Sequence, residues 1–253
     1  IEDYPKLIQN LKKNSGKTDI NFRKAMAYKS FDLISKYDNS ISNWLKNGKK
    51  IQNRVDLRYG ENPNQVSHIL NNNSLSIHDL QLSGKEISYN NIVDVDNGIK
   101  CLNEFIEPTC VIIKHNNPCG VASSTSIETA YKKALESDSK SAFGGILLLN
   151  RKINKKIASL ISKSFFELIL ATDFNKDALK ILSKKKILIL LKSDKIKIPK
   201  REFRSTLFGD LYQSIDTEKI NKKFLNLVAY KSASTNSLKD LIFALKVVKH
   251  LKS

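Results

Sequence analysis

Between residues 108 and 191, the chain alternates short apolar runs with segments whose apolar positions recur at helical spacing. The apolar runs predict strands at 111–113, 145–150, 166–171 and 187–191, and the segments between them predict helices at 126–137, 154–163 and 176–185. Strands that lack polar alternation are buried on both faces. The pattern therefore predicts an α/β fold with a mostly parallel sheet and helices on both faces.

Both ends of the chain carry helical patterns. Pro5 suits a first helical turn, and Thr18 or Asp19 can cap a second helix with an apolar stripe. An amphipathic helix is predicted over 236–253. We interpret residues 1–50 as a helical connector without chemistry of its own and residues 51–253 as the α/β domain.

Residues 51–100 lack strong periodicity and are rich in turn formers. Arg58 and Tyr59 stand just before a loop, GENPNQ. They are either ordinary surface residues or a guanidinium and a phenol that bind a phosphate and a planar ring. Farther on, Asn90 or Asn91 can cap a helix.

Candidate chemistry is densest in residues 108–120, PTCVIIKHNNPCG. An apolar run leads directly into Lys114, His115, two amides, a proline and a glycine. Open α/β sheets bind ligands beyond the carboxyl ends of their strands. This cluster therefore predicts an enzyme site, although a lone histidine is often structural.

His115 is the candidate proton acceptor, because histidine titrates near neutral pH. A positive charge on Lys114 close by would disfavour a second positive charge on the imidazole. Neighbouring residues of a strand point to opposite faces, so both side chains can share one site only where the strand gives way to a loop.

The charge of the chain favours no nucleic-acid partner. The net charge is +18, but only six of the 43 basic residues are arginines, and the lysines are dispersed. Solvated lysines or anionic small substrates explain this balance better than a nucleic-acid face, which stays open as an alternative. No apolar run is long enough for a membrane span.

The three cysteines predict neither a disulfide framework nor a metal site. Their number is odd and no pair has C-x-x-C spacing, which fits a reducing cytoplasm. Cys119 follows a proline as in zinc deaminases, but Ala122 stands where the second cysteine belongs and no H-x-E segment exists.

Four segments in this order resemble the bifunctional purine-biosynthesis family that joins AICAR transformylase to IMP cyclohydrolase: LRYGENPNQ (57–65), KEISYNNIVDVD (85–96), PTCVIIKHNNPCGVA (108–122) and SDSKSAFGGILLLNR (137–151). The resemblance implies that residues 1–50 end the cyclohydrolase region and connect it onward. It implies that residues 51–253 begin the transformylase, as an incomplete first lobe with a cytidine-deaminase-like fold and no zinc.

The resemblance also implies an activity and its residues. The family transfers a formyl group from 10-formyltetrahydrofolate to the 5-amino group of AICAR, as a homodimer, and then closes the ring to IMP. By resemblance, His115 is catalytic with Lys114 as its cationic neighbour. Arg58 and Tyr59 contact the nucleotide, and a substrate-contact position that is often glycine falls at Asp173.

The chain also departs from the family pattern. The family's cyclohydrolase loops and catalytic lysine would lie before residue 1, so we expect no cyclohydrolase activity. A KSNAIVY segment and the second, folate-contacting lobe would follow residue 252. We therefore expect the chain to be inactive alone. Residues 184–205 match nothing assignable. The alternative is a non-catalytic fragment of a split or decaying gene that pairs with another chain.

Overall fold

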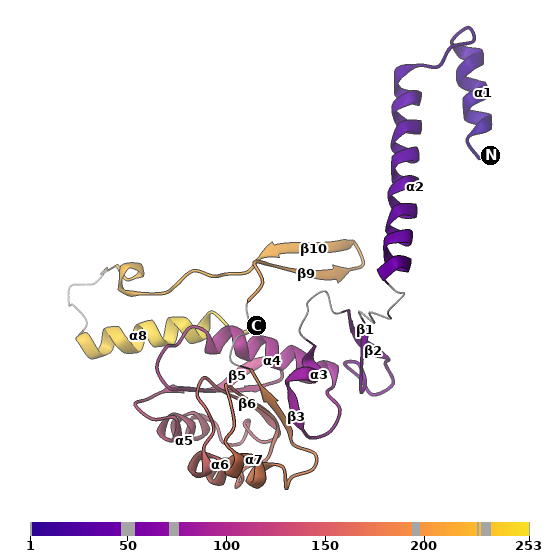
Figure 1. Cartoon of the computed structure of the whole chain (residues 1–253). Helices are drawn as coiled ribbons and strands as arrows, with labels where there is room; N and C mark the ends of the chain where they lie inside the picture. The colour runs from indigo at the N-terminus through magenta and orange to yellow at the C-terminus, as the bar shows by residue number, and fades with distance from the viewer. Residues whose placement is uncertain are drawn as a thin grey trace. The chain divides into compact units, whose positions relative to one another are not determined.

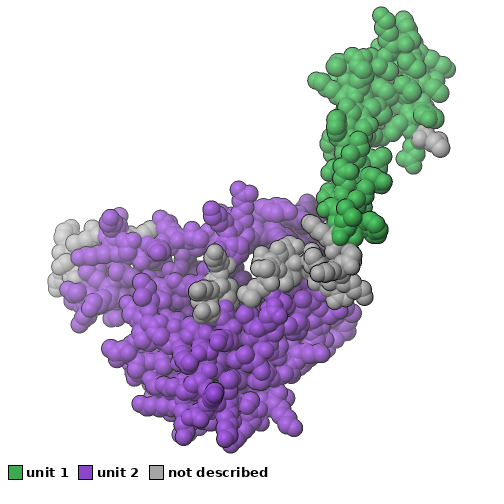
Figure 2. Space-filling model, viewed as in Figure 1, with its two compact units in different colours: residues 1–53 green, residues 54–253 purple. Residues whose placement is uncertain are grey.

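The structure is a computed structural model that describes residues 2–46, 54–70, 76–193, 198–226, 228 and 234–252. The chain divides into two compact units, residues 1–53 and residues 54–253 (Figure 2). That residues 1–50 and residues 51–253 belong to different functional regions stays a prediction. Within the described residues, no helix combines the length and apolar character needed to cross a membrane.

The first unit consists of two helices, α1 (Tyr4–Lys13) and α2 (Ile20–Lys46). Asp19 caps α2, because its carboxylate accepts a hydrogen bond from the backbone N–H of Phe22 at 2.8 Å. The helical prediction for this part of the chain is confirmed over these ranges. That the unit serves as a connector stays a prediction.

The second unit is built on a six-stranded sheet in the order β3-β8-β7-β6-β4-β5. Its strands are β3 (Gln81–Ser83), β4 (Thr109–Lys114), β5 (Asn117–Ser123), β6 (Gly145–Leu149), β7 (Phe166–Ala171) and β8 (Ile189–Lys192). Strands β6, β7 and β8 pair in parallel, as expected. In contrast, β4 is antiparallel to both β5 and β6, and β3 is antiparallel to β8.

The sheet is therefore mixed, although four of its strands share one direction. The expectation of a mostly parallel sheet missed the direction of β4, because the chain turns back within two residues and forms β5 at once. In consequence β4 ends beside the start of β6, with Ile113 opposite Ile146. We call this side of the sheet the hairpin edge, and the side where β6, β7 and β8 end the opposite edge.

Helices cover both faces of the sheet, as expected (Figure 1). One face packs against α5 (Ile127–Ser137), α6 (Lys155–Ile161) and α7 (Lys176–Leu182). The other face packs against α4 (Tyr89–Leu102) and α8 (Thr235–Val248). Alternate residues of each strand enter the two cores, so fully apolar runs were the correct signal for these strands.

The C-terminal helix is tied to the end of α4. The rings of Phe105 and Phe243 lie 5.2 Å apart, and the ammonium group of Lys249 lies 2.9 Å from the carboxylate of Glu104. Just after α8, the backbone N–H of Lys252 donates to the side-chain oxygen of Asn117 at 2.6 Å. The last described residue therefore lies at the first residue of β5, on the hairpin edge.

Several short elements were not expected from the sequence. They are β1 (Arg54–Leu57), β2 (Ser67–Leu70), α3 (Ile77–Leu80), β9 (Arg201–Thr206), β10 (Gly209–Ser214) and the 3-10 turn η1 (Lys222–Phe224). Strands β1 and β2 form one hairpin, and β9 and β10 form another. They have little buried surface, so no strong apolar periodicity marks them.

Gly120 allows β5 to lie against α5. A Cβ atom at this position would lie 2.1 Å from the backbone oxygen of Ala134. Backbone atoms cannot move aside as a flexible side chain can, so this contact requires glycine.

We predict that Gly120→Ala lowers the free energy of unfolding by about 1–3 kcal/mol, because the methyl group overpacks the β5–α5 contact. Chemical denaturation measures this change. The control is Ser159→Ala, on the exposed side of α6, for which we expect a change within about 0.5 kcal/mol. A Gly120→Ala variant as stable as this control would contradict the packing described here.

Candidate active site

His115 occupies the tip of the β4–β5 hairpin. The strands pair up to Lys114 and Asn117, which leaves His115 and Asn116 as a two-residue turn with φ of 50° and 67°. Positive φ at both central positions is the type I′ geometry, which normally selects asparagine and glycine. A histidine held in this conformation is uncommon and often marks a functional site. Its side chain is exposed at the hairpin edge.

Lys114 reaches across the same edge to the loop before β6. Its ammonium group donates to the backbone oxygen of Gly144 at 3.1 Å. Gly144 has φ of 68°, and its N–H donates to the backbone oxygen of Phe165 at 2.9 Å. The next residue, Gly145, approaches β4 so closely that a Cβ would lie 2.7 Å from the oxygen of Ile113. The two glycines thus bring this loop up to Lys114.

Asp94 of α4 holds the hairpin from one side. Its carboxylate accepts a hydrogen bond from the backbone N–H of Asn116 at 2.7 Å. Burial raises the pKa of Asp94, while this hydrogen bond and the nearby Lys114 ammonium group act in the opposite direction without cancelling it. The side-chain oxygen of Asn116 is buried and accepts no hydrogen bond from the described residues.

Arg58 and Tyr59 lie at the first turn of α4. The backbone N–H of Arg58 donates to Ile87, and the backbone oxygen of Tyr59 accepts from the N–H of Tyr89, the first residue of α4. The Arg58 side chain is exposed and packs on the Tyr59 ring, with its guanidinium carbon 4.5 Å from the ring centroid. Asp94 follows one and a half turns later, about 7.5 Å along the helix axis.

A second carboxylate stands on the same edge. Glu167, near the start of β7, accepts a hydrogen bond from the side-chain amide of Asn91 at 3.3 Å. It also lies 3.4 Å from the ammonium group of Lys85. Because Asn91 belongs to the first turn of α4, Glu167 lies between that turn and the sheet.

These groups together can bind an anionic, planar ligand. The cations are Arg58, Lys114 and Lys85, and the N–H groups at the start of α4 add positive potential. Phe143 is two-thirds exposed and packs against Phe165, 5.1 Å between ring centroids, next to Gly144. The site therefore combines a guanidinium, an imidazole and an exposed aromatic ring.

Asp173 is not brought to this site. It follows β7 at the opposite edge, about 20 Å along the strand from the hairpin edge. Its carboxylate lies 2.7 Å from Lys152 and 2.8 Å from Lys192, and these hydrogen bonds lower its pKa. Its backbone oxygen accepts a hydrogen bond from the N–H of Ile153 at 2.8 Å.

Sequence reasoning missed Asp94 and Glu167. Glu167 is the one charged residue in the apolar run FELILA, and a single carboxylate in a buried strand was a usable signal. Asp94 had no such signal, because other carboxylate and amide residues, such as Asp96 and Asn97, stand close by in the same segment. The helix cap was also misplaced by two or three residues, since Ser88 rather than Asn90 or Asn91 caps α4.

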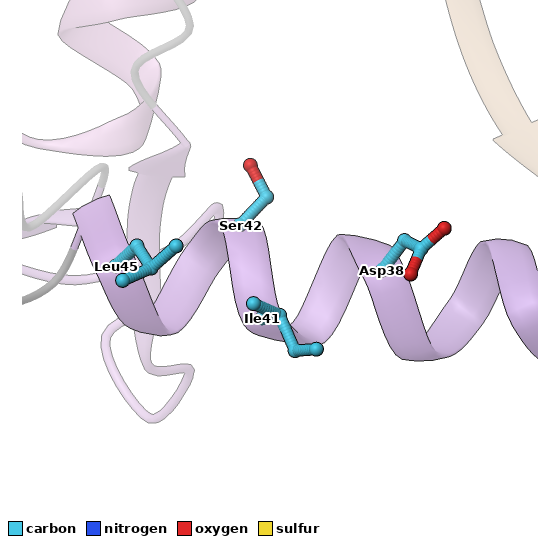
Figure 3. Close-up of a pocket in the computed structure, with 4 residues that line it drawn as sticks. All are labelled: Asp38, Ile41, Ser42 and Leu45. Carbon is cyan, nitrogen blue, oxygen red and sulfur yellow. The ribbon is translucent and has the colours of Figure 1, made fainter.

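Two surface hollows are lined by other residues than those of this site. One, of about 420 Å³, is lined by Asp38, Ile41, Ser42 and Leu45, all from α2 (Figure 3). Side chains from a single helix cannot surround a ligand, so we assign it no function. The other, of about 360 Å³, lies between α5 and α6, on the face of the sheet away from α4. Among the described residues, no three histidine, cysteine or acidic side chains gather to hold a metal ion.

The fold and the site define an α/β protein with a cationic site at one edge of its sheet. The model of the AICARFT/IMPCHase bienzyme family matches residues 1–253, and the chain belongs to this family. It is 42% identical over 271 residues to the bifunctional purine biosynthesis protein PurH of Caldicellulosiruptor bescii, and this match covers 100% of the chain. It is 40% identical over 273 residues to PurH of Acetivibrio thermocellus, a match that covers 99% of the chain.

The chain spans about half the length of these relatives, 52% in both cases. Among solved structures, a dCMP deaminase from the cyanophage S-TIM5 matches 40% of this chain and 96% of its own, with 12% identity and a TM-score of 0.31. A likeness this low supports no conclusion, so the deaminase-like architecture stays a prediction.

We predict a pH-dependent effect of Asp94→Asn. Because burial raises the pKa of Asp94 above 3.8, ionisation of this group costs stability in the folded state. That cost is absent at low pH, grows as the pH rises from the unfolded pKa of about 3.8 towards the folded pKa, and stays constant above it. The variant should therefore gain stability relative to the unsubstituted chain between about pH 3 and pH 6.

Urea denaturation across this pH range measures the difference. The matched control is Asp96→Asn, which removes an exposed carboxylate from the same helix. A stability difference for Asp94→Asn that does not change with pH, or that follows the control, would contradict the buried position of this carboxylate.

Proposed function

We propose that the chain supplies the AICAR-binding and proton-accepting part of a formyltransferase in purine biosynthesis. In this proposal, a formyl group moves from 10-formyltetrahydrofolate to the 5-amino group of AICAR. The observation that carries the proposal is the exposed, left-handed turn at His115, on the same sheet edge as Lys114. Membership of the bienzyme family supports the choice of substrates.

The arrangement along α4 supports the binding part of the proposal. Arg58 binds the phosphate of AICAR at the helix N-terminus, where the N–H groups add favourable potential. Tyr59 packs beside the guanidinium and contacts the ribose or the base. The axial spacing of about 7.5 Å between the first turn of α4 and Asp94 suits a nucleotide that extends from Arg58 to His115.

His115 accepts the proton that the amine must lose. As the amine nitrogen bonds to the formyl carbon, its proton passes to the imidazole, and the bond from the formyl carbon to the folate nitrogen breaks. The imidazolium then gives this proton to the leaving folate nitrogen, so His115 ends the step neutral. An amine conjugated to its ring is a weak nucleophile, which is why a base at this position matters.

Lys114 stabilises the negative charge that develops on the formyl oxygen. An ammonium group has three N–H donors, and Gly144 uses one of them. The remaining donors are available to an oxyanion at the hairpin edge. Asp173 has no role in this proposal, because it lies at the opposite edge.

The proposal assigns the rest of the catalytic machinery to the other half of a complete enzyme. We propose that the folate co-substrate contacts mainly that half and that this chain alone has no turnover. That the complete protein is a homodimer stays a prediction. The described cysteines are free, which suits a cytoplasmic enzyme.

We predict that AICAR raises the melting temperature of the chain and that Arg58→Ala weakens AICAR binding at least about tenfold, because it removes a charged phosphate contact. Thermal denaturation measures the melting temperature, and isothermal titration calorimetry measures the AICAR affinity of the unsubstituted chain and of the variant. The control is Asp173→Asn at the opposite edge, which should leave the affinity unchanged. Equal losses in the two variants would argue against a nucleotide at the hairpin edge.

We also predict the effect of His115→Ala on turnover in a hybrid that joins this chain to the segment that follows the matched region in the Caldicellulosiruptor bescii relative. Loss of the proton acceptor should lower kcat at least about a hundredfold, with a smaller effect on KM for AICAR. His78→Ala, at another histidine of the same domain, is the control. Full turnover without the imidazole of His115 would exclude its proposed role.

A further inference from the structure

The turn that carries His115 adopts a backbone conformation that is unfavourable for histidine. Left-handed backbone costs roughly 1–2 kcal/mol for most residues other than glycine, although asparagine adopts it more readily, and here His115 and Asn116 stand in succession with φ of 50° and 67°. The surrounding structure must therefore stabilise the turn, or the imidazole will sample other directions.

The hairpin itself leaves one group of this turn unused. The ladder between β4 and β5 ends at the pair Lys114–Asn117, so it does not use the N–H of Asn116. That N–H donates instead to the carboxylate of Asp94 at 2.7 Å. A hydrogen bond to a charged acceptor is short and strong, and this one joins the turn directly to α4.

The close approach of α4 to the sheet makes this contact possible. Gly98 lies one helical turn after Asp94, on the same face of α4. A Cβ at Gly98 would lie 2.4 Å from a methyl carbon of Leu148 and 3.1 Å from Ile113. Glycine therefore lets α4 lie against the end of β4, within reach of the turn.

We propose that Asp94 is a positioning residue: through the N–H of Asn116 it fixes the left-handed turn and thereby the direction of the His115 imidazole. This inference rests on the proposed function, in which His115 acts on a bound nucleotide. It adds a residue that need not touch the substrate. Asp94 acts on the reaction only through the hairpin.

The first test is amide hydrogen exchange of Asn116, measured by NMR on the chain itself. Asp94→Ala should accelerate this exchange at least about tenfold, because the amide loses its charged acceptor. Asp94→Asn keeps a neutral acceptor and should accelerate it less. Asp96→Ala, on the exposed side of the same helix, should leave it unchanged. Equal exchange in Asp94→Ala and Asp96→Ala would overturn the proposal.

The Asp94→Asn variant keeps the test decisive if Asp94→Ala does not fold. Asp94→Asn preserves the size of the side chain and tests the same contact alone. Exchange at Asn116 that is as slow in Asp94→Asn as in the unsubstituted chain would then overturn the proposal.

The second test asks whether the conformation of the turn affects AICAR binding. Asp94→Ala should weaken AICAR binding, and Asn116→Gly in the same chain should restore much of the loss, because glycine adopts the turn without strain. A merely structural role of Asp94 would not be rescued at position 116. Faster exchange without weaker binding, or weaker binding without rescue, would show that Asp94 does not position His115.

The two tests separate this inference from the proposed function. If the unsubstituted chain binds no AICAR, the proposed function fails and the positioning role falls with it. The exchange measurement still decides whether Asp94 holds the turn. If the unsubstituted chain binds AICAR and the Asp94 variants behave as the controls do, only the positioning role is wrong.

Discussion

β4 is paired on both sides to antiparallel neighbours, β5 and β6, and five of its residues are fully buried: Thr109, Cys110, Val111, Ile112 and Ile113. This pairing decides where the chemistry lies. A strand that runs against β6 must end where β6 begins, so Lys114 and His115 meet the loop at Gly144. The start of β7, with Glu167, reaches the same edge. The candidate site is thus a consequence of strand direction, and the helices that cover the sheet only complete it.

Strand positions were predictable because strands buried on both faces are apolar throughout, which is visible in the sequence. The runs that form β6, β7 and β8 are apolar without alternation, as expected for strands covered on both faces. Strand direction leaves no such mark. β5 was missed because NPCGVAS mixes amide, proline, glycine and small residues, which look like a loop. With β5 unseen, the hairpin and the antiparallel direction of β4 could not be inferred.

Site residues that stand together in the sequence were predictable, and those that join the site only through distant contacts were not. Lys114 and His115 were found because a polar cluster follows an apolar run. Asp94 contributes through a contact across 22 positions of the sequence, and such contacts depend on how α4 packs. Asp173 was placed by analogy with a position after a parallel strand. In this sheet the carboxyl ends of β4 and β7 lie at opposite edges, so that analogy does not bring the two residues together.

The central claim is that the hairpin edge holds the nucleotide. The most direct measurement is a crystal structure of the chain with AICAR. Our account predicts the phosphate at Arg58, beside the start of α4, and the aminoimidazole next to His115. AICAR bound instead at the opposite edge, near Asp173 and Lys152, would contradict it.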